Sequence, residues 1–455
     1  MKRFLCTQAL LHDGWQSDVL IEVDMQGVIT SVQQGVRDVP EQTERLSGLV
    51  IPSMVNLHSH AFQRAMAGLA EVAGDPQDSF WTWREQMYHL VSHLSPEQVG
   101  VIAAYLYIDM LKGGYTQVAE FNYLHHDKDG KPYQQDEMAL QLINAAGEAG
   151  IGQTLLPVLY TYSGFGGQAA QPLQKRFIQD TEAYLSRFAE LQKQIKEKAL
   201  HHAGICFHSL RAVSPVQMNQ VLSHAPVDLP VHIHIAEQMK EVNDCIAWSG
   251  QRPVEWLYDH AEVDSRWCLV HATHLTGQEV TSIADSRAVV GICTTTEANL
   301  GDGIFPAADY IQQGGRWGVG SDSHVSLSAV EELRWLEYGQ RLRDQRRNRL
   351  VDPVTGSVGD MLWQQAAAGG SQACGVNLGT LAVGKRADWL VLENNEWLEN
   401  LPSSLWLNRW LFGGQSQMIR DVYVAGKRVI EQGHHPLEFA VRQQFSQVMK
   451  ALKIS

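Results

Sequence analysis

The feature that most constrains the fold is a regular alternation of short apolar runs with longer, more polar segments. Eight runs have the length and composition of buried strands. They occupy residues 49–57, 115–122, 151–160, 204–211, 229–237, 267–273, 288–294 and 316–323. Eight strand–helix units in a chain of 455 residues predict an α/β fold, a (β/α)8 TIM-like barrel with additions. A doubly wound open sheet is the alternative, but no GxGxxG follows the first run to support nucleotide binding.

Helix signals between the runs support this alternation. Ser95 and Gln98 have the spacing of a capping box, and Pro96 stands at the first helical position. The segment continues to Lys112 and is closed by a Gly-Gly pair, which is typical of a helix end. The repeating unit is therefore strand, helix, strand.

The two ends of the chain differ from its middle. Residues 1–50 and 375–455 are rich in short strand-like runs separated by turns. Since both ends lie outside the barrel, we expect them to pair into one small β-sandwich domain, which leaves residues 51–374 as the metal-dependent barrel domain. A long insertion, residues 61–93, follows the first barrel strand and is placed to cover the barrel mouth.

Composition and charge exclude several classes of protein. Hydrophobic content of 44% and charged content of 19% are ordinary for a globular chain. A net charge of −14 argues against a nucleic-acid partner, because phosphate binding needs clustered Lys and Arg. Polar residues interrupt the amino terminus before a signal peptide could form, and no apolar stretch is long enough to span a bilayer, so we expect a cytoplasmic protein. The six cysteines form no CxxC pair, which disfavours a cysteine-based zinc site.

The first apolar run ends in His-Ser-His. Side chains alternate faces along a strand, so His58 and His60 project from the same face and can bind one metal ion. Two nearby histidines are a weak signal by themselves, and further ligands are needed. The fifth run supplies a third imidazole from His232 or His234, with a carboxylate at Glu237.

Two more strand ends carry candidate ligands. His271 ends the sixth run and Asp322 ends the eighth. Taken singly, a histidine can be a satisfied core residue and an aspartate can cap a helix. Together they stand at the carboxyl ends of successive barrel strands, where catalytic groups of such barrels meet. Three histidines and one aspartate there predict a site for zinc or another divalent first-row ion.

This pattern resembles the amidohydrolase superfamily, which has an HxH after strand 1, histidines after strands 5 and 6, and an aspartate after strand 8. Residues 378–388, LGTLAVGKRAD, resemble the family's return into its small β-sandwich, so the resemblance covers nearly the whole chain. Ser53 stands where many members have glycine. The resemblance implies that the metal ligands are His58, His60, His234 and Asp322, and that Glu237, His271 and Asp322 are catalytic.

The number of metal ions also follows from the resemblance. Two-metal members carry a bridging carboxylated lysine on the fourth strand, and residues 204–211 contain no lysine. Together with the sequence His-Ile-Ala-Glu at 234–237, this implies the one-metal deaminase branch, with a single divalent ion, zinc in the first place. Such an ion generates hydroxide from a bound water near neutral pH. Glu237 would shuttle protons and His271 would orient the nucleophile or stabilise the intermediate.

Residues 56–66 (NLHSHAFQRAM) and 80–84 (FWTWR) resemble one group of these deaminases, which act on a linear amidine. That resemblance implies hydrolytic deimination of N-formimidoyl-L-glutamate to N-formyl-L-glutamate and ammonia, a step of histidine degradation. The two substrate carboxylates call for arginine, which binds carboxylates bidentately. The residues implied for substrate binding are Gln63, Arg84, Tyr123, His208 and Arg211.

Two other functions stay open. A deaminase of a purine or another heterocycle would use the same metal and Glu237, with an aromatic pocket built from residues such as Trp81, Trp83 and Phe165. A catalytically inactive scaffold of the same fold is the alternative from another class, and the retention of every ligand argues against it. As partners we expect a small dicarboxylate substrate, no nucleic acid and no membrane, with the chain forming a homodimer.

Overall fold

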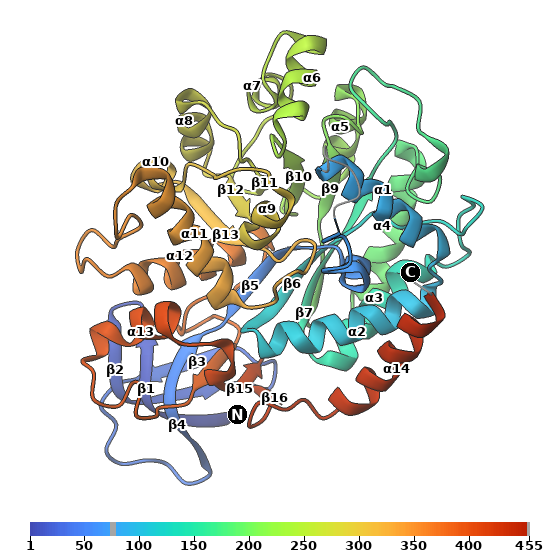
Figure 1. Ribbon diagram of the computed structural model, residues 1–455. Helices are drawn as coiled ribbons and strands as arrows, with labels where there is room; N and C mark the ends of the chain where they lie inside the picture. Colours follow the sequence, from blue (N-terminus) through green and yellow to red (C-terminus); the bar gives the residue numbers. More distant parts are fainter. Residues whose placement is uncertain (73–78, 453–455) are drawn as a thin grey trace.

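The computed structural model describes residues 1–72 and 79–452, and within these residues eight parallel strands close into a barrel (Figure 1). The strands are β5 (Met54–Ser59), β6 (Tyr115–Asn122), β7 (Gly152–Leu159), β9 (Ile205–Ser209), β10 (Val231–Ile235), β11 (Trp267–His271), β12 (Val289–Ile292) and β13 (Arg316–Val319). The pair Val319 and Asn56 joins β13 to β5 and completes the ring. A short strand, β8 (His201–Ala203), precedes β9 and pairs with the first half of β7. The predicted barrel is thus confirmed, and each of the eight apolar runs contains one barrel strand.

A second sheet is formed by both ends of the chain, as expected. Its strands are β1 (Lys2–Leu11), β2 (Gly14–Val23), β3 (Ile29–Gln33), β4 (Thr43–Pro52), β14 (Trp389–Leu392), β15 (Ile419–Val424) and β16 (Lys427–Ile430). They follow the order β16-β15-β14-β4-β1-β2-β3 and have an apolar core of their own, which includes Phe4, Trp389 and Tyr423. In Figure 1 the blue N-terminal strands and the red β15 and β16 lie together beside the barrel. The exact division into domains at residues 50 and 375 stays a prediction.

The first apolar run is not one barrel strand, and that part of the expectation is wrong. Residues 49–52 end β4 in the second sheet, where they pair with β14, and the barrel strand β5 begins only at Met54. Ser53 lies at the crossing, and the indole Nε1 of Trp363 donates to the Pro52 carbonyl there at 2.9 Å. Both halves of the run are buried, so an unbroken apolar sequence does not reveal that the chain passes from one sheet to the other.

Helices surround the barrel. They are α1 (Phe80–His93), α2 (Pro96–Lys112), α3 (Glu137–Ala149), α4 (Thr181–Ile195), α5 (Pro215–His224), α6 (Met239–Ser249), α7 (Pro253–His260), α8 (Gly277–Ser286), α9 (Thr294–Leu300), α10 (Ala307–Gln312), α11 (Ala329–Asp344), α12 (Val358–Ala373), α13 (Trp406–Gly413) and α14 (Glu438–Leu452), with 3-10 turns η1 (Ala61–Met66), η2 (Pro172–Gln174), η3 (Ser403–Leu405) and η4 (Ser416–Met418). The capping box at Ser95 is present, with Ser95 Oγ accepting from Gln98 N. The C-terminal α14 lies along α2, where the Tyr105 and Phe445 rings stack at 4.1 Å between centroids (Figure 1).

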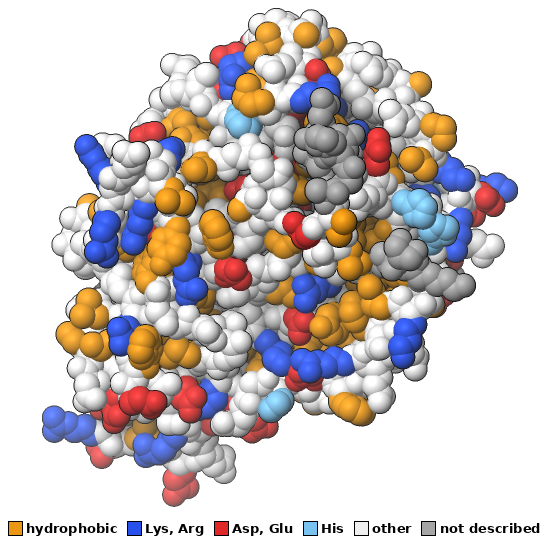
Figure 2. Space-filling view, in the orientation of Figure 1, with side chains coloured by type: hydrophobic (Ala, Val, Ile, Leu, Met, Phe, Trp, Pro, Cys, Tyr) orange, Lys and Arg blue, Asp and Glu red, His pale blue; other side chains and the backbone are white. Residues whose placement is uncertain are grey.

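The surface shows no single concentration of charge on the face in view. Figure 2 shows acidic and basic side chains interspersed there. Of the helices in residues 1–72 and 79–452, none has the length and apolar character needed to cross a bilayer.

Helix α12 packs so closely on the barrel wall that glycine is required in it. A Cβ added at Gly369 would overlap the carbonyl oxygen of Trp317 in β13. Replacing Gly369 by alanine must therefore push the helix away from the strand, which costs about 1–3 kcal/mol as overpacking.

We expect Gly369→Ala to lower the midpoint of thermal unfolding, measured by scanning calorimetry. The matched control is Gly147→Ala in α3, where an added Cβ meets nothing within 4 Å. That change should stabilise by about 0.5–1 kcal/mol, because alanine is the better helix former. A Gly369→Ala protein as stable as the control variant would contradict the packing argument.

Candidate metal centre and active site

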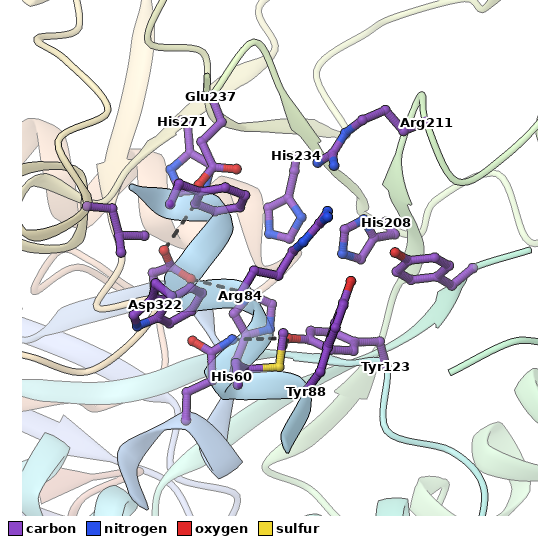
Figure 3. A pocket seen from close by; sticks show the side chains of 16 residues that line it. His60, Arg84, Tyr88, Tyr123, His208, Arg211, His234, Glu237, His271 and Asp322 are labelled. Atoms are coloured by element: carbon purple, nitrogen blue, oxygen red, sulfur yellow. Dashed lines mark hydrogen bonds and ion pairs between the residues drawn. The ribbon is translucent and has the colours of Figure 1, made fainter. Parts of the chain in front are cut away.

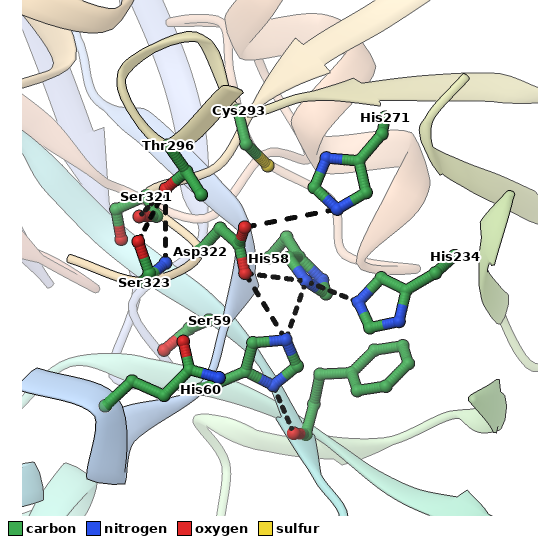
Figure 4. A network of polar contacts seen from close by, with 12 residues as sticks. His58, Ser59, His60, His234, His271, Cys293, Thr296, Ser321, Asp322 and Ser323 are labelled. Atoms are coloured by element: carbon green, nitrogen blue, oxygen red, sulfur yellow. Dashed lines mark hydrogen bonds and ion pairs between the residues drawn. The ribbon is translucent and has the colours of Figure 1, made fainter. Parts of the chain in front are cut away.

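Four side chains from three different strand ends converge at one mouth of the barrel (Figure 4). His58 lies in β5 and His60 directly after it, His234 lies in β10, and Asp322 follows β13. Their donor atoms are close together. His58 Nε2 is 3.1 Å from His60 Nε2 and 2.9 Å from His234 Nε2, and Asp322 Oδ1 is 3.3 Å from both His58 Nε2 and His60 Nε2.

The protonation of these groups suits a cation. Burial lowers the pKa of His58 to about 3 and lowers those of His60 and His234, so the rings are neutral near pH 7. His60 Nδ1 lies 3.0 Å from the Phe121 carbonyl, an acceptor, and must carry the proton. Its Nε2 therefore presents a lone pair to the centre. Neutral imidazole nitrogens and a carboxylate facing one point repel unless a positive charge lies between them, and this N3O donor set fits a divalent ion such as zinc.

Of the two histidines in β10, only His234 lies beside the other three donors. His232 points away from the centre, and its Nε2 lies 2.7 Å from the Ala373 carbonyl in α12. His234 lies on the same face of the strand, as alternation requires, but two residues nearer its carboxyl end, where its Nε2 is 2.9 Å from His58 Nε2.

Unusual backbone conformations mark the strand ends that carry these groups. His271 and Asp322 have φ of 68° and 45°, and Ala236, beside Glu237, has φ of 50°. This left-handed region is uncommon for residues other than glycine and concentrates at functional sites. The turn at Ala236 is held by Glu241, whose carboxylate accepts from the backbone N–H groups of Ala236 and Glu237, each at 3.2 Å.

Glu120, which sequence reasoning missed, braces the segment around His60. Its carboxylate accepts from Ala61 N and Ser59 Oγ, both at 2.7 Å, and from Tyr107 Oη at 3.0 Å. It thus fixes the residues on both sides of His60, while the next residue of β6 fixes the ring. Burial raises the pKa of Glu120 to about 7, although all three donors lower it.

A chain of acid and imidazole groups adjoins the four donors. His271 Nε2 lies 3.7 Å from Glu237 Oε1 and 4.0 Å from Asp322 Oδ2, and its Nδ1 lies 3.3 Å from Glu297 Oε1. Burial alone would lower the pKa of His271, but Glu237 and Glu297 raise it well above the usual value, which makes the ring an imidazolium. Burial raises the pKa of Glu237 to about 7, so this carboxyl can take up and release a proton near neutral pH.

Asp302 is a further buried carboxyl beside this chain. It lies in a cluster with Glu237 and His271 whose polar atoms are within 4.8 Å of one another, and it accepts a hydrogen bond from the Gln238 amide. Burial and the charge of Glu237 raise the pKa of Asp302 to about 10, which keeps it neutral.

The centre opens into a pocket whose far end is cationic (Figure 3). The Arg84 and Arg211 guanidinium carbons lie 4.5 Å and 5.7 Å from the centroid of the Trp81 ring. Among the residues that the structure describes, neither guanidinium forms an ion pair, and the buried Nε of each has no hydrogen-bond partner. The indole face offsets part of the repulsion between the two cations, which leaves their N–H groups available to an anion in the pocket.

The comparisons with known proteins agree with this geometry. The Amidohydrolase family profile matches residues 49–429. The chain belongs to the amidohydrolase family. A formimidoylglutamate deiminase of Pseudomonas aeruginosa is 56% identical over 454 residues, which cover 99% of this chain and 100% of that protein.

Two solved structures support the fold at different levels of similarity. An amidohydrolase from Brucella melitensis matches with a TM-score of 0.95 and 45% identity, covering 99% of this chain and 100% of that one. An adenosine deaminase from Xanthomonas campestris with bound zinc matches with a TM-score of 0.81 and 22% identity, covering 100% and 98%. This second likeness shows the barrel fold alone.

The residues expected to bind substrate all line the pocket of this amidohydrolase. They are Gln63, Arg84, Tyr123, His208 and Arg211, and the pocket also contains His60, His234, Glu237, His271 and Asp322. Gln63 Nε2 donates to Tyr123 Oη at 3.0 Å. The insertion at residues 61–93 contributes Trp83, Arg84 and Tyr88 of α1 to the pocket lining. Residues 73–78 of the insertion are outside the described part of the chain.

The aromatic pocket of the heterocycle alternative is only partly assembled. Trp83 lines the pocket, whereas Trp81 packs against Arg84. Phe165 stacks on Trp248 with ring centroids 5.5 Å apart and does not contribute to the pocket lining found in the described residues.

Several residues of the site were missed by sequence reasoning. They are Tyr88, Glu120, Tyr160, Glu297, Asp302 and His324. Glu120 follows the pattern of a carboxylate inside an apolar strand, a signal that could have been noticed. The others lie on helices and loops, and only the folded structure shows that these segments lie close to the site. His324 is buried and bridges Ser59 Oγ (3.3 Å) to Ser321 Oγ (2.8 Å).

We expect Glu120→Ala to destabilise the protein markedly, because each buried donor left without an acceptor costs about 1–3 kcal/mol and three donors lose theirs. The measurement is the midpoint of thermal unfolding of the metal-free protein. Glu148→Ala, at an exposed position of α3, is the matched control and should change it little. Equal midpoints for the two variants would show that Glu120 does not brace this segment.

Proposed function

We propose that this amidohydrolase hydrolyses N-formimidoyl-L-glutamate to N-formyl-L-glutamate and ammonia, a step of histidine degradation. The observation that carries the proposal is the charge order of the pocket. One end holds the metal donors and the Glu237–His271 pair, and the other end holds Arg84 and Arg211 without carboxylate partners among the described residues. The substrate has the complementary order, an amidine at one end and two carboxylates nearby. The strong similarity to a formimidoylglutamate deiminase supports the same substrate.

The proposed ligands of the ion are His58, His60, His234 and Asp322, and the proposed ion is a single zinc. Their four donor atoms face one point, which supports one ion rather than two. When bound, a divalent ion supplies Lewis-acid activation of the attacking water. A homodimeric state and a cytoplasmic location stay predictions from the sequence.

The protein's own groups then manage the protons. Glu237, with a pKa raised to about 7 by burial, accepts a proton from the attacking water and delivers it to the imino nitrogen, so that ammonia can leave. The His271 imidazolium, held by Glu297 on its far nitrogen, orients the water and stabilises negative charge on the oxygen that adds to the amidine carbon. Asp322, 4.0 Å from His271, receives the remaining proton of that oxygen as the carbonyl forms, and this second proton passes to the leaving nitrogen, which departs as ammonia and leaves Asp322 as a carboxylate.

Ammonia release from N-formimidoyl-L-glutamate by purified, metal-loaded protein tests the proposal, with adenosine and guanine as competing substrates. We expect turnover of the amidine and little of either heterocycle. Glu237→Gln should lower kcat about 10²–10⁴-fold, because it removes the proton carrier. Preference for a heterocycle would favour the alternative deaminase, and no turnover of any of the three by a metal-loaded protein would favour the inactive scaffold.

The cationic end is tested separately. Arg84→Met and Arg211→Met should each raise KM for the dicarboxylate, with kcat/KM falling about 10- to 100-fold, since a charge-assisted bidentate contact is lost. Arg346→Met, at an exposed position beyond α11, is the matched control and should leave KM unchanged. Unchanged kinetics in both pocket variants would refute the carboxylate assignment.

A further inference from the structure

A buried amide orients two tyrosine hydroxyls at the cationic end of the pocket. Gln174, only 1% exposed, donates from Nε2 to Tyr160 Oη at 2.8 Å and to Tyr88 Oη at 3.3 Å. The orientation of the amide is fixed by its other atom, because Gln174 Oε1 accepts from the backbone N–H of Gln171 at 2.8 Å. The NH2 group must therefore face the tyrosines.

Both hydroxyls thus act as acceptors toward Gln174. A phenol has one hydrogen to donate, so each still has its own O–H to place. The two hydroxyls also interact with each other, which occupies at most one of these hydrogens. At least one O–H is left to point elsewhere, and burial together with Tyr88 raises the pKa of Tyr160, so it stays protonated.

The cationic neighbours of this pair can donate hydrogen bonds but not accept them. Tyr88 and Tyr160 line the same pocket as Arg84 and Arg211, and the Arg84 guanidinium lies 5.5 Å from the Tyr88 ring centroid. A guanidinium cannot accept a hydrogen bond. The Tyr160 ring packs against His208 at 4.3 Å between centroids. Within the described residues, the recorded hydrogen bonds of the two hydroxyls are those to Gln174 and to each other, and a ligand carboxylate would suit both the remaining O–H and the two guanidiniums.

We infer that Tyr88 and Tyr160, oriented by Gln174, bind the side-chain carboxylate of the substrate and select for a distal carboxylate. In Figure 3, Arg84 lies between Tyr88 and the pair Glu237 and His271, so we place the distal carboxylate on the Tyr88 side of the pocket. Gln174 is a positioning residue, because it acts through the two hydroxyls. This inference rests on the proposed function for the identity of the substrate.

Three substrates separate the two carboxylates in kinetic tests. N-formimidoyl-L-glutamate has both, N-formimidoyl-L-glutamine replaces the distal one by a neutral amide, and N-formimidoyl-4-aminobutyrate keeps only the distal one. For the first and third, Tyr88→Phe/Tyr160→Phe should lower kcat/KM about ten- to hundredfold, mainly through KM, because hydrogen bonds to a charged acceptor are lost. For the glutamine derivative, kcat/KM should stay within about threefold of that of the unaltered protein, since no distal charge is present.

Single variants and controls complete the test. Each single Tyr→Phe change should lower kcat/KM in the same way but by less. Gln174→Leu should reproduce the rise in KM, although both hydroxyls remain. Tyr338→Phe, on α11 beside Arg341, is the matched control and should change nothing. An equal loss for all three substrates, or no loss for any, would overturn the inference.

A binding measurement keeps this inference distinct from the proposed activity. Glutarate, a dicarboxylate without an amidine, is titrated into the metal-loaded protein, and its affinity is followed by the shift in unfolding temperature. We expect weaker binding by Tyr88→Phe/Tyr160→Phe than by the Tyr338→Phe control. If the unaltered protein fails to hydrolyse formimidoylglutamate but the two variants differ in glutarate affinity as expected, the proposed function is wrong and the carboxylate site stands. Equal glutarate affinity of the two variants refutes the carboxylate site, whatever the activity of the unaltered protein.

Discussion

The convergence of three imidazole nitrogens and one carboxylate on a single buried point is the constraint on which the rest of the site depends. Ring nitrogens 2.9 Å and 3.1 Å apart whose lone pairs face each other repel unless a proton or a cation lies between them. Holding them there requires outside support. Glu120 fixes the chain on both sides of His60, the Phe121 carbonyl fixes its ring, and the Asp322 N–H donates to the His58 carbonyl at 3.0 Å, which ties the first and last barrel strands together.

The pocket beside these four donors has acidic and cationic side chains at opposite ends. The acid end contains Glu237 with the imidazolium of His271, and the cationic end contains Arg84 and Arg211 against Trp81. A substrate with an amidine and carboxylates can satisfy both ends only in one orientation, which places the amidine carbon beside Glu237. Recognition and catalysis are therefore consequences of the same arrangement, because charge matching at the far end positions the reacting atoms.

Much of the fold and of the metal centre could be predicted from the sequence, since both depend on local patterns. Apolar runs of strand length give the eight barrel strands, and the alternation of side chains along a strand places His58 and His60 on one face. The division of residues 49–57 between two sheets could not be predicted, because the run is buried on both sides of Ser53. Sequence patterns also cannot show positive φ at His271 and Asp322, which depends on contacts between distant strand ends. Gln174 and its two tyrosines are brought together from three separate segments, and no spacing in the sequence links them.

Anomalous diffraction from crystals of the purified protein, recorded on both sides of the zinc absorption edge, tests the central claim most directly. The account predicts one zinc peak per chain, at about 2.0–2.2 Å from the Nε2 atoms of His58, His60 and His234 and from a carboxylate oxygen of Asp322. Two peaks within the barrel mouth would contradict the single-ion site. A single peak held by other residues, with these four side chains left paired to one another, would contradict the assignment of the ligands.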